Sequence, residues 1–175
     1  FKQKTAYEIY QCDWSSDVCS SDLVETTVRG LEPVLKGETI TGLTLHRGDL
    51  RRPFPDGLGQ RLTGAEVTGL GRRAKYGLIE TDRGDTLIFH LGMSGRWRID
   101  PGEIGKHDHL VIETRHHRLA LNDPRRFGSV DLVPTDEVPH WPPFAALGPE
   151  PLGPDFTAAH LARAFKGRVA PIKAL

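Results

Sequence analysis

A short loop with the sequence "LGMSGR" contains the first residues of chemical interest. Met93 is the only methionine of the chain, and Gly92 and Gly95 flank it without side chains that could pack around it. Residues 86–91 alternate between two faces as a β-strand does, and they lead directly into this loop. The pattern predicts that Met93 projects from a turn. The alternative is a side chain that fills a gap in the core.

A second stretch, "GRRAKYG", concentrates positive charge beside another predicted strand. Lys75 follows Arg72 and Arg73, and a strongly hydrated ammonium in such a run is suited to contact a phosphate group. The alternative is a solvated edge-strand lysine that discourages aggregation. The histidines of "HDH" and "HH" predict no metal site, because alternating side chains on a strand point outward singly and no cysteine accompanies them.

The composition is that of an ordinary soluble protein, with 38% hydrophobic and 26% charged residues in a chain of 175. No apolar run approaches the roughly 18 residues of a membrane span, and residues 1–22 lack the apolar region of a signal peptide. These residues carry two lysines against four acidic residues, so the rest of this neutral chain carries +2 and all eight histidines. That bias is compatible with nucleic acid. Cys12 and Cys19 give no disulfide or metal framework, which suits a reducing cytosol.

The chain from Val24 onward predicts a mainly β fold, a sandwich of about eight strands with a flanking helix. Val24, Val28, Leu31 and Leu35 share one helical face, and Gly37 is the expected C-cap. Turn sequences at 81–86 and 114–118 predict hairpins. The strands are expected near 39–47, 61–70, 74–81, 86–91, 95–99, 108–114, 118–122 and 127–133.

Four segments follow from these patterns. Residues 1–22 show no period and are expected to be non-native or disordered, and 23–134 form the sandwich. Residues 134–154 contain seven of the thirteen prolines, which predicts a linker over 135–154. Residues 155–175 begin a helical domain, with Asp155 as the expected N-cap, and the chain is expected to be truncated there.

Six blocks, in order along residues 24–175, resemble the formamidopyrimidine-DNA glycosylases and their endonuclease VIII relatives. They are "VETTVRGLEP", "GRRAKYGLIE", "IFHLGMSGRWRI", "KHDHLVI", "NDPRRFGSV" and "LGPEPLGPDF". The fourth and sixth blocks make the match closer to the formamidopyrimidine branch.

This resemblance implies a base-excision-repair glycosylase and AP lyase. Such enzymes remove 8-oxoguanine and formamidopyrimidines from double-stranded DNA and then cleave the abasic strand. The implied fold is a β-sandwich followed by a helix–two-turn–helix domain and a zinc finger, so zinc is expected only in a C-terminal part absent here. A monomer in the bacterial cytoplasm, without a membrane partner, is expected.

The resemblance also assigns roles to the loop residues. Extrusion of a lesion leaves a hole in the base stack, which apolar or planar side chains can fill. Met93 would be the wedge, Arg125 would meet the orphaned partner base, and Phe127 would enter a neighbouring step. For Phe127 the alternative is a place in the core of the sandwich.

Phosphate contacts complete the implied site. The family places the lysine that matches Lys75 against a phosphate beside the lesion and uses it as a proton donor in β-elimination. His90, His107 and Arg168 match further positions of DNA contact, with Arg168 in the least distinctive block.

The resemblance stops inside the family's most demanding motif. Family members attack with the amine of an N-terminal Pro in "Pro-Glu-Leu-Pro-Glu-Val-Glu" and use the next Glu as acid and base. Here the match starts at Val24, preceded by "SSDL". The break predicts a foreign segment joined near residue 23, rather than a native extension, and an inactive chain. A non-catalytic relative that binds damaged DNA and a β-sandwich interaction module remain as alternatives.

Overall fold

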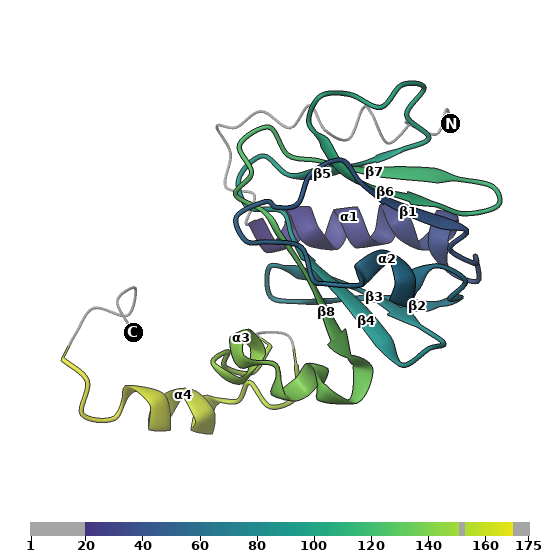
Figure 1. Cartoon of the computed structure of the whole chain (residues 1–175). Helices are drawn as coiled ribbons and strands as arrows, with labels where there is room; N and C mark the ends of the chain where they lie inside the picture. Colours follow the sequence, from purple (N-terminus) through teal and green to yellow (C-terminus); the bar gives the residue numbers. More distant parts are fainter. Residues whose placement is uncertain (1–19, 151–152, 170–175) are drawn as a thin grey trace, which may run out of the picture.

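Two four-stranded antiparallel sheets build the body of the molecule, and a long helix runs between them (Figure 1). The computed structural model describes residues 20–150 and 153–169. One sheet has the strand order β1-β6-β7-β5 and the other β2-β3-β4-β8. The predicted fold class, a β-sandwich with a flanking helix, is therefore confirmed.

The strands arise where apolar and polar residues alternate between turn residues. Hairpins join β3 to β4 and β6 to β7, at the two predicted turns. The bounds are β1 Gly42–Leu45, β2 Val67–Arg73, β3 Tyr76–Thr81, β4 Asp85–His90, β5 Arg96–Ile99, β6 Asp108–Glu113, β7 Arg118–Asn122 and β8 Ser129–Pro134.

Helix α1, Ser20–Leu35, supplies one wall of the core. Its four predicted core residues are all buried, and they belong to one hydrophobic cluster with side chains from both sheets, such as Leu87 and Leu121. Gly37 adopts a φ of 81°, as expected of a residue that ends a helix. The helix begins before the first predicted position, Val24, and Pro33 lies inside it without ending it. Of the predicted segment 1–22, residues 1–19 lie outside the described residues.

A second, smaller core lies on the outer face of the β2-β3-β4-β8 sheet. Ile88 and Val133 point to this face, and Phe144 covers them together with Tyr76 and Trp141. Phe144 belongs to α3, Pro142–Ala145, and Trp141 joins α3 to the preceding 3-10 helix η2, Thr135–His140, which adds Val138 to the cluster. Much of the proline-rich stretch predicted as a linker therefore packs against the sheet, because its apolar side chains shield Ile88.

Two local predictions are wrong. Residues at the start of the predicted strand 61–70 form the end of a short helix, α2 Leu58–Leu62, which buries both of its leucines. The last helix, α4 Ala158–Phe165, is capped by Thr157 and not by Asp155, since the Thr157 hydroxyl accepts a hydrogen bond from the His160 amide. Within the described ranges, no helix combines the length and apolar character needed to cross a membrane.

Candidate functional site: one end of the sandwich

Six of the seven predicted site residues meet at one end of the sandwich. Tyr76, next to Lys75, pairs with His90, which in turn pairs with Ser129 at the start of β8. In the other sheet Asn122 lies opposite both Arg96 and Asp108. The strand ends thus gather the 74–75 turn, the 91–95 loop, His107 and the 123–128 loop, a set that we call the loop end.

The turn that carries Lys75 is held from two sides. Ala74 has a φ of 50°, and its amide donates a hydrogen bond of 2.9 Å to Glu150 Oε1. Arg72 donates to Glu25 Oε2 on α1 at 3.0 Å, and Arg73 pairs with Glu150 at 3.1 Å. Lys75 itself is exposed and makes no ion pair among the described residues. The neighbouring charges are therefore engaged in structure, while the Lys75 ammonium is available to a ligand.

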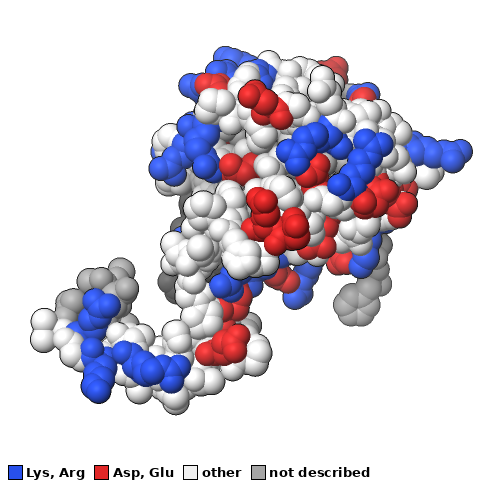
Figure 2. Space-filling model, turned by 60° about the horizontal axis from the view of Figure 1, so that its bottom comes forward, with Lys and Arg blue, Asp and Glu red and all other residues white. Residues whose placement is uncertain are grey.

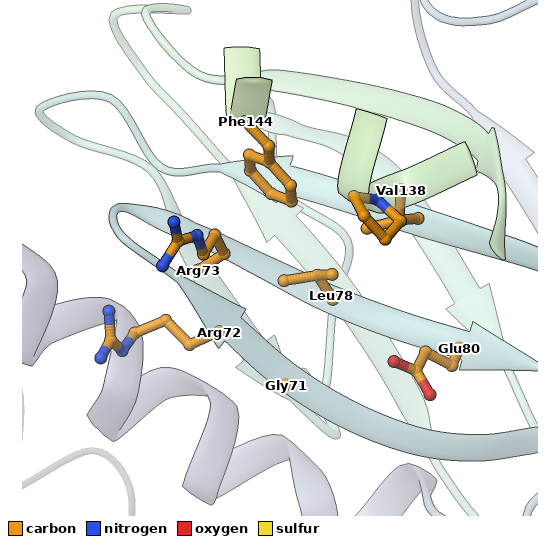
Figure 3. Close-up of a pocket in the computed structure, with 8 residues that line it drawn as sticks. Gly71, Arg72, Arg73, Leu78, Glu80, Val138 and Phe144 are labelled. Atoms are coloured by element: carbon orange, nitrogen blue, oxygen red, sulfur yellow. The ribbon is translucent and has the colours of Figure 1, made fainter. Parts of the chain in front are cut away.

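A shallow pocket of about 410 Å³ lies beside this turn (Figure 3). Arg72 and Arg73 stand at one side and Glu80 at the other, with Leu78 between them and Phe144 above. Because its arginines already pair with carboxylates, the pocket offers little free charge to an anionic ligand. The exposed groups of the loop end are the better candidates for function.

His90 is half-buried among cations. Burial is the main cause that lowers its pKa below the ordinary range, and the positive charges of Lys75, Arg51 and Arg52 lower it further. Its Nδ1 accepts a hydrogen bond of 3.0 Å from the Gly92 amide. The imidazole is therefore neutral near pH 7 and holds the amide of Gly92, the residue before Met93.

This environment predicts a loss of stability in acid. The folded-state pKa of His90 lies below that of the unfolded chain, so the unfolded chain binds the proton more readily. The contribution to the free energy of unfolding is present above the ordinary His pKa near 6.5 and is lost as the pH falls through the lower folded value. We expect His90→Gln to flatten urea-unfolding stability over that interval. His140→Gln, at an exposed histidine, is the control, and equal curves for both variants would contradict the prediction.

Met93 and Phe127 project from two loops whose backbones touch. Met93 is 55% exposed and Phe127 44% exposed. Gly92 has a φ of 62°, and a Cβ there would lie 2.5 Å from the Phe127 carbonyl carbon. Only glycine permits this approach. The core alternatives for both side chains are excluded, since each of these large apolar groups stands in solvent on one of the two touching loops.

Arg125 completes this exposed group. Its guanidinium carbon lies 4.7 Å from the centre of the Phe127 ring, which is a cation–π geometry. The planar guanidinium and the aromatic ring can thus contact the same planar ligand group. The arrangement offers a flexible thioether, an aromatic ring and a hydrogen-bonding plane at one surface.

The remaining predicted residues are placed differently. His107 is half-buried directly before β6, with its ring centroid 6.3 Å from that of His109. His109 is buried and contacts the Asp123 carbonyl oxygen at 2.9 Å, so the prediction that these histidines face outward is wrong for His109. Among the described residues no three His, Cys, Asp or Glu side chains form a metal site.

Arg168 lies apart from the loop end. It follows α4, on an extension away from the sandwich (Figure 1), and its amide donates a hydrogen bond of 3.0 Å to the Phe165 carbonyl oxygen. Figure 2 shows positive side chains on this extension, which carries Arg163, Lys166 and Arg168. These positive side chains lie on the C-terminal extension and not at the loop end.

Sequence reasoning missed Arg51. Its amide donates to the Gly128 carbonyl oxygen at 3.1 Å, and its exposed guanidinium makes no ion pair within the described residues. Neighbouring Arg52, in contrast, pairs with Asp131 at 2.7 Å. The run "RR" could have been noticed, but only the fold places it beside His90.

Comparison with known proteins agrees with this architecture. The sequence profile described as Formamidopyrimidine-DNA glycosylase N-terminal domain matches residues 23–130. The formamidopyrimidine-DNA glycosylase of Rhizorhabdus wittichii is 71% identical over 153 residues, 87% of this chain and 57% of that protein. The Novosphingobium aromaticivorans enzyme is 69% identical over the same shares. The chain thus spans little more than half the length of these relatives.

Solved structures give the same result. The Lactococcus lactis enzyme in complex with DNA containing an abasic site superposes with a TM-score of 0.78 at 30% identity, over 86% of this chain and 57% of that one. A complex of the same enzyme with Fapy-dG DNA also gives 0.78. Profile, relatives and fold agree, and the chain belongs to the formamidopyrimidine-DNA glycosylase family.

Proposed function

We propose that this chain is the β-sandwich part of a DNA glycosylase and AP lyase for oxidised purines, and that its loop end binds double-stranded DNA at a damaged or abasic site. The observation that carries the proposal is the exposed group of Met93, Arg125 and Phe127 on two touching loops. Family membership supports the reaction class, and relatives solved with abasic-site and Fapy-dG DNA support the partner.

The chemistry of the loop end suits this role. An enzyme that acts on a base must take it out of the stack, and side chains that fill the hole offset part of an unstacking cost of a few kcal/mol. Met93 would fill the hole, Phe127 would enter the next step and Arg125 would offer donors to the unpaired base. Lys75, His90, His107 and the newly found Arg51 would contact phosphates.

Equilibrium binding to matched duplexes tests the proposal. One duplex carries a single tetrahydrofuran analogue of an abasic site, and the other is intact. The full chain is expected to prefer the abasic-site duplex. For either duplex, the logarithm of the binding constant should fall linearly with the logarithm of the salt concentration. Binding without salt dependence, or without preference, would favour the interaction-module alternative.

Single cations give a sharper expectation. Lys75→Ala and Arg51→Ala should each weaken binding to both duplexes and lower the magnitude of the salt slope by about 1, since each removes one phosphate contact. Arg115→Ala is the matched control. Arg115 is an exposed cation in the β6–β7 turn, at the opposite end of that hairpin from His107. A loss at Arg115 equal to that at Lys75 would contradict a localised site.

A second function, a non-catalytic protein that binds damaged DNA, is favoured by the residues before Val24. Counting back along the family motif places Cys19 where the nucleophilic Pro is expected and Ser20 where the Glu is expected. Neither residue supplies a secondary amine or a carboxylate. Among the residues that the structure describes, no cluster of three His, Cys, Asp or Glu side chains fits the zinc that the resemblance implies, and we assign no residue to it. We place both functions in the bacterial cytoplasm.

A further inference from the structure

The geometry points to Ser94 and Asp123 as a positioning pair that fixes Met93, Arg125 and Phe127 relative to one another, so that the three side chains enter a gapped base stack as one unit. This inference rests on the proposed function. It adds two residues that touch no DNA themselves but lie beside residues that do.

Asp123 joins the two loops through its carboxylate. The side chain is buried, with 1% of its surface exposed. Ser94 Oγ donates a hydrogen bond of 2.6 Å to Oδ1, and the Gly128 amide donates one of 2.8 Å to Oδ2. Hydrogen bonds to an ionised carboxylate are shorter and stronger than neutral ones. Within the described residues this carboxylate has no cationic partner, so the two loops alone stabilise its buried charge.

Ser94 extends the connection to Arg125. The Arg125 amide donates to Ser94 Oγ at 3.3 Å, while the same hydroxyl donates to Asp123. Ser94 follows Met93 directly, and Gly128 follows Phe127. Each of the three exposed side chains therefore lies on, or next to, a residue held by the pair.

The pair is anchored to the sheet. The Asp123 amide donates to the His107 carbonyl oxygen at 2.9 Å, and the buried His109 ring contacts the Asp123 carbonyl oxygen at 2.9 Å. Strand β6 thereby provides a fixed reference for both loops. Ser94 lies outside the strands and its hydroxyl bonds only to the 123–128 loop among the described residues, so it contributes to loop position rather than to strand pairing.

The single methionine makes this testable. The full chain is labelled with ¹³C-methyl methionine and released from a fusion tag, so that Met93 gives the only signal. For the wild type we expect the chemical shift of this methyl signal to change when the abasic-site duplex binds and not when the intact one does. Ser94→Ala should remove that change in chemical shift and reduce the preference for the abasic-site duplex about tenfold. This is the size of effect expected from the loss of one charge-assisted hydrogen bond. Affinity for the intact duplex should stay unchanged, while the melting temperature should fall by a few degrees, because the buried Asp123 carboxylate keeps only one of its two hydrogen bonds.

Two further variants separate positioning from general structure. Ser94→Thr keeps the hydroxyl and should restore both the preference and the Met93 shift. Asp123→Asn should lose them as Ser94→Ala does. Ser94 and Gly128 donate to different carboxylate oxygens, and the amide replaces one of these with an NH2 group that cannot accept and removes the charge that strengthens both hydrogen bonds. If Ser94→Ala and Asp123→Asn keep the wild-type preference and shift, the positioning pair is refuted while the proposed function stands. If the wild type shows no preference, both fail together. Binding to both duplexes weakened by the same factor would indicate a structural role only and would also overturn the pair.

Discussion

Incubation of this chain with an abasic-site duplex and borohydride is expected to give no covalent protein–DNA complex. The family's lyase chemistry needs a terminal amine, whose pKa near 8 leaves a useful neutral fraction at pH 7 that can attack the sugar. An internal residue offers only an amide nitrogen, whose lone pair is delocalised into the carbonyl group. Ser20 already belongs to the continuous helix α1, and the motif position before it is the internal residue Cys19. Robust trapping by the natural chain would contradict the prediction.

A matched variant identifies the cause. Residues 1–23 are replaced by Pro-Glu-Leu-Pro-Glu, so that this sequence runs directly into Val24 and starts with a free Pro amine. We expect a borohydride-trapped complex for this variant and none for the same variant with an acetylated N-terminus. Gel mobility of the labelled duplex measures both. If neither the variant nor its acetylated form is trapped, the lyase reaction lacks some other part of the site, and the missing N-terminal amine is not the only cause.

The fold was largely predictable because most strands are bounded by local signals. The alternation at 86–91 and the turn residues that follow it specify β4 and its loop without any distant contact. Helix α1 is equally local, since its four apolar residues repeat at helical spacing. These elements need only hydrophobic periodicity to be found.

The missed elements are those that long-range packing stabilises. Helix α2 has only five residues and follows Gly57, so neither length nor propensity marks it, and burial of Leu58 and Leu62 decides its conformation. The segments η2 and α3 are rich in proline, which suggested a linker. They fold because Phe144 covers an apolar sheet face that the sequence pattern did not identify as needing a cover.

The candidate site divides in the same way. The projection of Met93 from a turn could be predicted from Gly92 and Gly95, which lie close to it in the sequence. In the structure both glycines allow a close approach of backbone segments. The Ser94–Asp123 hydrogen bond joins residues 29 apart in the sequence, and Arg51 reaches His90 only through the fold. No periodicity encodes such contacts, so the structure is needed to find them.

Gly77→Ala is expected to destabilise the sandwich more than any exposed substitution. Gly77 is buried on β3 and lies opposite Phe89 in the register of β3 and β4. A Cβ at this position would lie 2.1 Å from Phe89 Cζ, well inside van der Waals contact. Phe89 is fully buried against Trp97, with ring centroids 5.6 Å apart, so its ring has no free space to enter. We expect the free energy of unfolding to fall by about 3 kcal/mol, and the melting temperature by about 10 °C.

Gly71→Ala is the matched control for that prediction. Gly71 lies on the neighbouring strand β2, and a Cβ there would meet nothing within 4 Å, so the change should stay within about 0.5 kcal/mol. Equal urea midpoints for the two variants would refute the packing argument.

Phe89 directly precedes His90, whose ring holds the Gly92 amide at the base of the Met93 loop. A displaced Phe89 ring should therefore also shift the Met93 methyl signal in the folded fraction of Gly77→Ala, and Gly71→Ala should leave that signal in place.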